Sequence, residues 1–287
     1  TMLYIYGALL AYGIGLGEAM HGLFGFSALI SSVVFYLVLA AVVYLGLKTV
    51  TKAEVMLTPF IFLIIFGIAF FAFKHISLDE YLKTNITNIF LPLGSLFFAL
   101  LGVWCVSDMK RILKNKKSLR KTIILGTTIP AVLYLILAAV VVGVTGAETT
   151  EVFGVGLAQY LNPMMSKIVF IFIIFTISTS FLGVGFTLQE MFQEEYKRKK
   201  WQSWLAAFLL PFLFLFFLKT GFAEVITITG ALATVVLVAI ILLMFYKARK
   251  RGDRKPEYSL LVPKFVGLLI FLFSLLIAVV TVFKYVR

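Results

Sequence analysis

Long apolar stretches separated by short polar or charged segments make up nearly the whole chain. Nine such stretches lie at residues 2–17, 27–47, 53–73, 89–109, 122–145, 166–189, 203–218, 221–246 and 261–283. A helix needs roughly 20 apolar residues to cross a hydrocarbon core of about 30 Å, and most of the stretches are that long. Their apolar positions are continuous and do not alternate with polar ones, as the strands of a membrane barrel would. The pattern therefore predicts an all-α polytopic membrane protein.

The composition supports this prediction. The chain of 287 residues is 62% hydrophobic and 14% charged, and its mean hydropathy is +1.06. A soluble globular chain is closer to half apolar and a quarter charged. The only cysteine is Cys105 and the only histidines are His21 and His75. These counts exclude a disulfide framework and a metal cluster built from Cys and His alone, so no metal is expected beyond a possible Na⁺.

The basic residues are distributed unevenly between the connections. Of the 26 Lys and Arg residues, 20 lie in alternate connections and six in the others. An excess of Lys and Arg marks the cytoplasmic loops of membrane proteins. We therefore expect a multi-pass protein of the cell (cytoplasmic) membrane whose main basic loops are cytoplasmic. Because membrane orientation accounts for the net charge of +13, the charge does not indicate a nucleic-acid partner.

The fourth stretch ends in LFFALLGVWCVSDMKRILKNKK, residues 96–117, where the apolar pattern stops abruptly. Gly102 leaves helical geometry easily, and Ser107 and Asp108 are residue types that often begin helices. The sequence therefore allows a helix that ends near Gly102, an irregular segment over Val103–Val106, and a second helix from Ser107. A broken membrane helix is tolerated where its freed backbone groups line a cavity or bind a ligand. An unbroken helix over 89–109, about 30 Å long, remains the alternative.

The sixth stretch contains FTISTSFLGVG, residues 175–185, in which Thr176, Thr179 and Ser180 follow helical spacing. Hydroxyl groups in a membrane helix can bond to another helix or back-bond to the preceding turn. Their oxygens can also coordinate a hard cation, which makes these three residues candidate ion ligands. The spacing does not choose between these uses.

The first stretch places small residues, among them Gly15, beside Tyr12. Small residues at helical spacing are typical of close helix packing. Alternatively, Tyr12 could stand on a cavity wall and contact a substrate. None of the stretches contains a nucleophile–base pair or a metal-binding set at membrane depth, so the sequence indicates that the protein is not an enzyme.

Residues 97–146, beginning FFALLGVWCVSD, and residues 177–185, ISTSFLGVG, resemble amino acid permeases of the amino acid–polyamine–organocation superfamily. The similarity is greatest to the prokaryotic aromatic amino acid (tryptophan/tyrosine) permease branch. The resemblance implies a leucine-transporter-like fold of two inverted repeats, with the nine stretches equivalent to family helices three to eleven and the first two helices absent.

On this basis the resemblance divides the chain into three parts. Residues 1–88 would be the remnant of the first repeat, with three spans. Residues 89–247 would be the second repeat, with five spans of which the first is broken. Residues 248–287 would form a cytoplasmic basic loop and an extra C-terminal span.

The resemblance also assigns roles to individual residues. It implies that the broken segment contacts the substrate through Gly102, Val103, Trp104 and Cys105, and that Tyr12 is the matching cavity aromatic. It implies that the Thr179–Ser180 pair contributes to a cation site. The chain departs from the family at Ser107-Asp108, where relatives often have Pro-Glu.

The function implied is a secondary active transporter, a symporter of amino acids, aromatic or large neutral. Alternating access would be driven by a Na⁺ or H⁺ gradient, with no cofactor beyond that ion. The expected partners are the amino acid and the lipid bilayer, and no nucleic acid. The alternative is a membrane scaffold or partner subunit that transports nothing.

Overall fold

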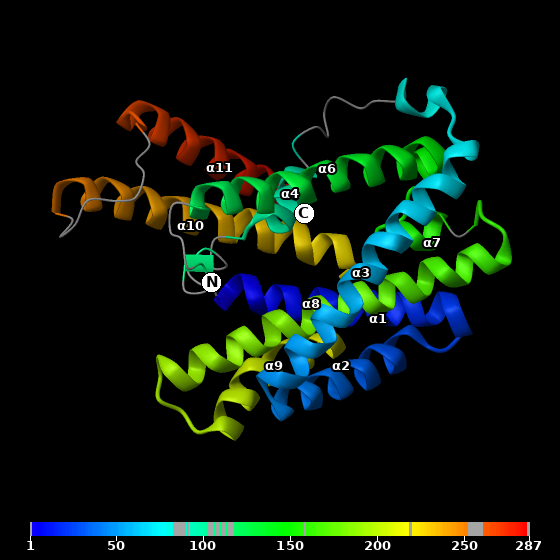
Figure 1. Cartoon of the computed structure of the whole chain (residues 1–287), viewed down its shortest axis with the longest axis horizontal. Helices are drawn as coiled ribbons and strands as arrows, with labels where there is room; N and C mark the ends of the chain where they lie inside the picture. Colours follow the sequence, from blue (N-terminus) through cyan, green and yellow to red (C-terminus); the bar gives the residue numbers. More distant parts are fainter. Residues whose placement is uncertain are drawn as a thin grey trace. The chain divides into compact units, whose positions relative to one another are not determined.

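The computed structural model contains helices and connecting segments, and no strand occurs in the residues it describes (Figure 1). These are residues 2–82, 90, 92–102, 106, 109–110, 113, 118–157, 159–217, 220–251 and 261–285. The α-helices are α1 (Met2–Phe24), α2 (Ala28–Leu45), α3 (Leu47–Ala72), α4 (Pro92–Leu100), α6 (Leu119–Thr145), α7 (Phe153–Leu157), α8 (Pro163–Glu194), α9 (Lys200–Phe217), α10 (Phe222–Arg251) and α11 (Lys264–Tyr285). Short 3-10 helices lie at Phe73–His75, Leu78–Leu82 and Gly146–Glu148.

Each predicted apolar stretch overlaps one of these helices, although α4 covers only nine residues of the stretch 89–109, and α7 is an additional short helix. Within the described residues, α1, α2, α6, α8, α9, α10 and α11 are long and apolar enough to cross a membrane. The prediction of an all-α polytopic membrane protein is confirmed. The first helix extends further than its apolar stretch, because no proline interrupts it before Gly25, whose φ is +73°. Glu18 and His21 therefore belong to the last two turns of α1 and do not follow the helix.

The chain forms two compact units. Unit 1 consists of Thr1–Thr84 with Leu137–Ile226, and unit 2 of Asn85–Ile136 with Thr227–Arg287. The helices α6 and α10 each pass from one unit into the other. Each unit is built from segments that are distant in the sequence.

The core of unit 1 is a cluster of α1, α2, α8 and α9, which pack against one another. Glycines allow the closest approaches between them. A side chain at Gly17 would collide with the Ser32 hydroxyl and the Ala28 carbonyl, so α1 and α2 meet backbone to backbone there. The third helix, α3, packs against α8.

Residue contacts define the direction in which these four helices run. Gly22 of α1 lies against Phe170 of α8, and Gly15 lies against Ile177, so the two helices are antiparallel. The contacts Gly17–Ser32 and Gly13–Tyr36 show that α1 and α2 are antiparallel. The contacts Tyr36–Phe208 and Ala40–Trp204 show that α2 and α9 are antiparallel. The contacts Tyr6–Ala206 and Gly13–Leu215 show that α1 and α9 are parallel. Thus α1 and α9 run one way, and α2 and α8 run the other.

Aromatic residues of α2 and α9 pack against each other and against α8. The Tyr36 hydroxyl is buried and donates a hydrogen bond to the Phe208 carbonyl at 3.0 Å. The Tyr36 ring meets the Phe181 ring edge-on, with 5.0 Å between centroids. One turn along, Trp204 Nε1 donates to the Ala40 carbonyl at 2.7 Å. These side chains satisfy their polar atoms inside an apolar cluster, which burial requires.

Unit 2 contains α4, the first part of α6, most of α10, and α11. A side chain at Gly94 of α4 would collide with the Thr227 carbonyl, and one at Gly230 of α10 with the Gly94 carbonyl, so the two helices cross closely. The hydroxyls of Ser95 and Thr227 lie 2.6 Å apart and share a hydrogen bond. One turn along α10, Ala231 packs with Ile277 of α11.

Candidate functional site

The helix α4 stops two residues before Gly102. Leu101 and Gly102 are not helical, and the Gly102 N–H donates to the Leu100 carbonyl at 3.0 Å in a tight turn. Among the described residues, no atom lies within 4 Å of where a side chain at Gly102 would begin, so the backbone there borders open space. This end agrees with the prediction of a helix terminus near Gly102.

Several predicted residues lie outside the described part of the chain. They include three of the five substrate candidates, Val103, Trp104 and Cys105, and the expected start of the second helix at Ser107 and Asp108. Among their described neighbours, Val106 and Met109 are helical.

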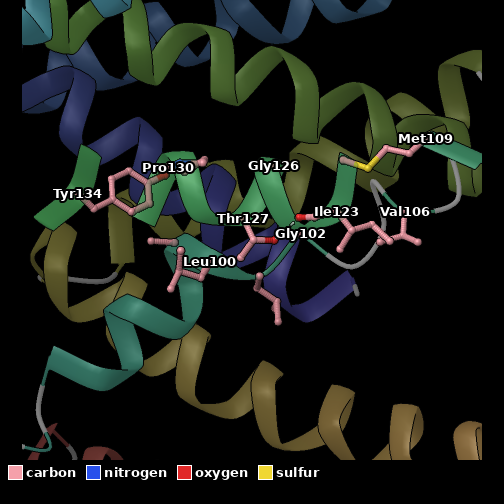
Figure 2. A pocket seen from close by; sticks show the side chains of 11 residues that line it. Leu100, Gly102, Val106, Met109, Ile123, Gly126, Thr127, Pro130 and Tyr134 are labelled. Carbon is pink, nitrogen blue, oxygen red and sulfur yellow. Dashed lines mark hydrogen bonds between the residues drawn. The ribbon is translucent and has the colours of Figure 1, made fainter. Parts of the chain in front are cut away.

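A cavity of about 320 Å³ opens where α4 ends, and it lies entirely within unit 2 (Figure 2). It is lined by Ala99, Leu100, Leu101, Gly102, Val106, Met109, Ile123, Gly126, Thr127, Pro130 and Tyr134. In Figure 2, the side chains from Ile123 to Tyr134 come from α6, whereas Leu100 and Gly102 come from the end of α4. Gly102 is therefore a wall residue of a real cavity.

The wall contributed by α6 contains a second backbone irregularity. Pro130 lies inside the helix and has no N–H, so the carbonyl of Gly126, four residues earlier, lacks its usual helical donor. Gly126 and Pro130 both line the cavity. Between them, the Thr127 hydroxyl donates to the Ile123 carbonyl at 2.9 Å. This site was not among those predicted from the sequence, although a proline inside an apolar stretch was a visible signal of it.

These features determine what the cavity can bind. The helix α4 ends at Leu100, whose carbonyl accepts from the Gly102 N–H, and a helix C-terminus carries about half a negative charge. Together with the Gly126 carbonyl, this end of α4 suits an ammonium group or a cation. Apart from Thr127 and Tyr134, the described side chains of the wall are apolar and suit an apolar group.

Gly102 lies in unit 2. The remaining described site residues lie in unit 1; they are Tyr12, Thr176, Thr179 and Ser180. Tyr12 is half-buried on α1. The antiparallel contacts of α1 with α8, in which Gly15 meets Ile177, bring the turn around Tyr12 to the level of Ser180. Tyr12 and the predicted ion ligands therefore lie at a similar level along the axes of these two helices.

The hydroxyl groups of α8 bond within their own helix. Thr176 Oγ1 donates to the carbonyls of Phe172 and Ile173 at 2.9 and 3.0 Å, and Thr179 Oγ1 donates to the Thr176 carbonyl at 2.9 Å. Such back-bonding uses the hydroxyl proton and leaves the oxygen lone pairs available to a cation. Thr179 is buried, but Ser180 is exposed, because successive residues of a helix point about 100° apart.

A comparison with known protein families matches residues 2–281 to the tryptophan/tyrosine permease family. The chain belongs to this family. The resemblance found in the sequence is thereby confirmed over nearly its whole length. Permeases are membrane transport proteins.

A curated relative of this permease is "Glutamine transporter 2" of Aliivibrio fischeri, which is 30% identical over 151 residues. The match covers 51% of this chain and 39% of the relative. The permease therefore spans about two fifths of the length of the curated relative that it matches.

Proposed function

We propose that this permease carries an amino acid across the cell membrane as a secondary active transporter. The observation that carries the proposal is the end of α4 at Leu100, which opens onto the cavity beside Gly102 in a chain of this family. Interrupted helices whose freed backbone groups face a cavity are the sites at which many transporters bind their substrates.

The substrate we propose is an aromatic or large neutral amino acid. A cavity of about 320 Å³ is at the small end of the range for small-molecule sites, which suits a single amino acid. Its ammonium group would be bound by the carbonyls at the end of α4 and by that of Gly126. Its side chain would lie against apolar wall residues such as Ile123 and Met109. Tyr12, Val103, Trp104 and Cys105 remain the further candidates for substrate contact.

The name of the curated relative makes glutamine the competing substrate. A glutamine side chain would need polar partners for its amide, because burying an amide without hydrogen bonds is unfavourable. Thr127 and Tyr134 are the polar side chains that the described wall offers. The predominance of apolar side chains in the wall favours the aromatic or large neutral class.

For the transport cycle we propose alternating access between two inverted repeats. If the helices correspond to family helices three to eleven, α1 and α8 are the third helices of the two repeats, and α2 and α9 are the fourth. In inverted repeats, equivalent helices cross the membrane in opposite directions. The antiparallel contacts of α1 with α8 and of α2 with α9 support this correspondence.

We further propose that the carrier is a symporter driven by Na⁺ or H⁺. The hydroxyl oxygens of Thr176, Thr179 and Ser180 are the candidate Na⁺ ligands. Replacing Thr179 or Ser180 by Ala should then lower uptake at low Na⁺, and higher Na⁺ should restore it. Thr187→Ala is the control, since its hydroxyl back-bonds to the Gly183 carbonyl in the same way two turns away. Uptake insensitive to Na⁺ would leave H⁺ as the coupling ion.

The decisive experiment is uptake of radiolabelled tryptophan by the full-length protein in proteoliposomes, with an imposed Na⁺ or H⁺ gradient. Unlabelled tyrosine, phenylalanine, leucine and glutamine should be tested as competitors. We expect gradient-driven accumulation, with stronger competition by tyrosine and phenylalanine than by glutamine. The absence of accumulation for all twenty common amino acids would favour the alternative function, a membrane scaffold or partner subunit.

A further inference from the structure

A second cavity lies in unit 1, at the corner where α8 ends and α9 begins. Figure 1 shows how the chain turns between these two helices. Its volume is about 380 Å³, and it is lined by Phe192 and Tyr196 from the end of α8 and its connection, Arg198 from the connection, and Gln202 and Ala206 from α9. The lining thus combines apolar side chains with a guanidinium, an amide and a phenol. The carrier function proposed above uses none of these residues.

The backbone of the connection holds Arg198 firmly in place. The Arg198 N–H donates to the Phe192 carbonyl at 3.2 Å, which folds the connection back over the end of α8. Lys197 has a φ of 51°, in the left-handed region that a residue with a side chain adopts only at a cost. The Gln202 amide oxygen accepts from the Lys199 N–H at 3.2 Å, which leaves the amide NH₂ group as a donor. The corner is therefore a formed turn and not a loose loop.

The charge at this corner is positive. Four basic residues, Lys197, Arg198, Lys199 and Lys200, follow two acidic ones, Glu194 and Glu195. Lys200 is engaged locally, since its ammonium lies 4.8 Å from the centre of the Tyr44 ring. Among the described residues, no carboxylate forms an ion pair with Lys197, Arg198 or Lys199. The guanidinium of Arg198, which lines the cavity, is therefore available to an anion.

Aromatic side chains indicate that the corner lies at the membrane surface. Tyr196 and Trp201 are 54% and 53% exposed on either side of the basic residues. Partly exposed tyrosine and tryptophan are typical of the interface between hydrocarbon and water. Because α8 and α9 are each long and apolar enough to cross a membrane, we expect the connection between them to lie near the lipid headgroups. An anion with an apolar tail is the ligand that such a place presents.

We propose that this corner binds an anionic phospholipid. The phosphate would accept hydrogen bonds from the Arg198 guanidinium and the Gln202 amide, and the glycerol and upper acyl chains would lie along Phe192 and Ala206. A guanidinium binds phosphate through two parallel hydrogen bonds, which a lysine ammonium cannot make. The basic neighbours add the general attraction of an anionic membrane surface for Lys and Arg.

Native mass spectrometry of the purified full chain tests this proposal. The protein is incubated with dioleoylphosphatidylglycerol or dioleoylphosphatidylcholine, and the bound lipid is counted. We expect retention of phosphatidylglycerol over phosphatidylcholine. Arg198→Gln should reduce this retention about tenfold, since it removes a charge-assisted contact while keeping the backbone bond to Phe192. Ala206→Leu, which fills the apolar side without changing charge, should reduce it as well.

Lys199→Gln is the matched control, because it removes the same charge from the adjacent position, which does not line the cavity. It should change retention less than twofold, as expected for a screened surface charge. Equal losses in Arg198→Gln and Lys199→Gln, or equal retention of the two lipids, would overturn the proposal in favour of general surface attraction. Displacement of phosphatidylglycerol by millimolar inorganic phosphate would overturn it in favour of a free anion as the ligand. Binding is measured without transport, so the result is independent of the proposed carrier function.

Discussion

Single prolines inside helices have different consequences in this permease. Pro59 in α3, Pro130 in α6 and Pro211 in α9 each remove one helical hydrogen bond. Pro59 is exposed, whereas Pro211 is buried in unit 1. Only Pro130, among these three, lines the cavity at the end of α4. The acceptor that it frees is the one that we propose binds the substrate.

Replacing Pro130 by Ala should weaken substrate binding. The new N–H can donate to the Gly126 carbonyl. It would then compete with the ammonium group of the amino acid for this acceptor. A hydrogen bond to a charged group contributes about 1.5–3 kcal/mol, so the KM for uptake should rise about tenfold or more. Pro59→Ala is the control and should leave KM unchanged. Equal KM values for Pro130→Ala and the unmodified protein would show that the Gly126 carbonyl does not bind the substrate.

At the scale of helices, close pairs depend on glycines at which two backbones meet. The α1–α2 pair meets at Gly17, and the α4–α10 pair meets at Gly94 and Gly230. Helices in a membrane gain little from the hydrophobic effect between them, so association relies on close van der Waals contact and hydrogen bonds. A methyl group at such a contact pushes two rigid backbones apart.

Gly17→Ala should therefore destabilise the protein by about 1–3 kcal/mol, because its methyl group meets the Ala28 carbonyl and the Ser32 hydroxyl. Gly67→Ala in α3 is the matched control, since nothing lies within 4 Å of the added methyl group. That change should be neutral or stabilising by up to about 1 kcal/mol, because Ala favours helix over Gly. The fraction that remains monodisperse in size-exclusion chromatography after heating measures both. Equal losses would contradict the packing argument.

The N-terminus of α10 is held by a side chain from the segment before α7. A Glu151 carboxylate oxygen accepts from the Ala223 N–H at 3.1 Å, and the carboxylate lies directly over Gly221, where any side chain would collide with it. Negative charge at a helix N-terminus is stabilising. The contact ties the connection between α6 and α8 to the start of α10.

Removing this cap with Glu151→Ala should cost about 1 kcal/mol and loosen the connection. Limited proteolysis in proteoliposomes measures the effect as faster cleavage between residues 146 and 162. Glu148→Ala, an exposed carboxylate three residues earlier, should cleave at the unmodified rate. Unchanged cleavage in Glu151→Ala would mean that the cap does not hold the connection.

At the scale of the whole molecule, the two units differ in how their helices are bound. The cluster of α1, α2, α8 and α9 in unit 1 has close glycine contacts and buried aromatic hydrogen bonds. In unit 2, α4 has only nine helical residues and ends at the cavity, and α6 is weakened by Pro130. Elements with few internal bonds open most readily.

Hydrogen exchange of the full-length protein in nanodiscs should reflect this difference. Amides of α1, α2, α8 and α9 should exchange most slowly, with little change on adding substrate. Peptides covering residues 92–102 and 123–134 should exchange faster and should be protected by the amino acid. Protection confined to the four-helix cluster would place the substrate elsewhere.

Properties that depend on a single segment could be predicted from the sequence alone. Length and continuous apolarity identified the helices, because both are properties of one stretch of side chains. Gly102 marked the end of α4 at Leu100, because a glycine leaves helical geometry easily. The family resemblance was also contained in short segments. The roles of Thr176, Thr179 and Ser180 were left open, because hydroxyl spacing is the same whether the oxygens back-bond or bind a cation.

Only the tertiary structure decided which distant residues meet. It placed Gly126 and Pro130 opposite Gly102, gave Thr179 and Ser180 different surroundings, and formed the basic cavity around Arg198. Helices of similar apolarity can pack in many registers, and what selects one is the fit of glycines, aromatic rings and hydrogen bonds between helices. The sequence by itself therefore determined that this permease is a helical membrane protein and to which family it belongs, and packing decided where it has room to bind.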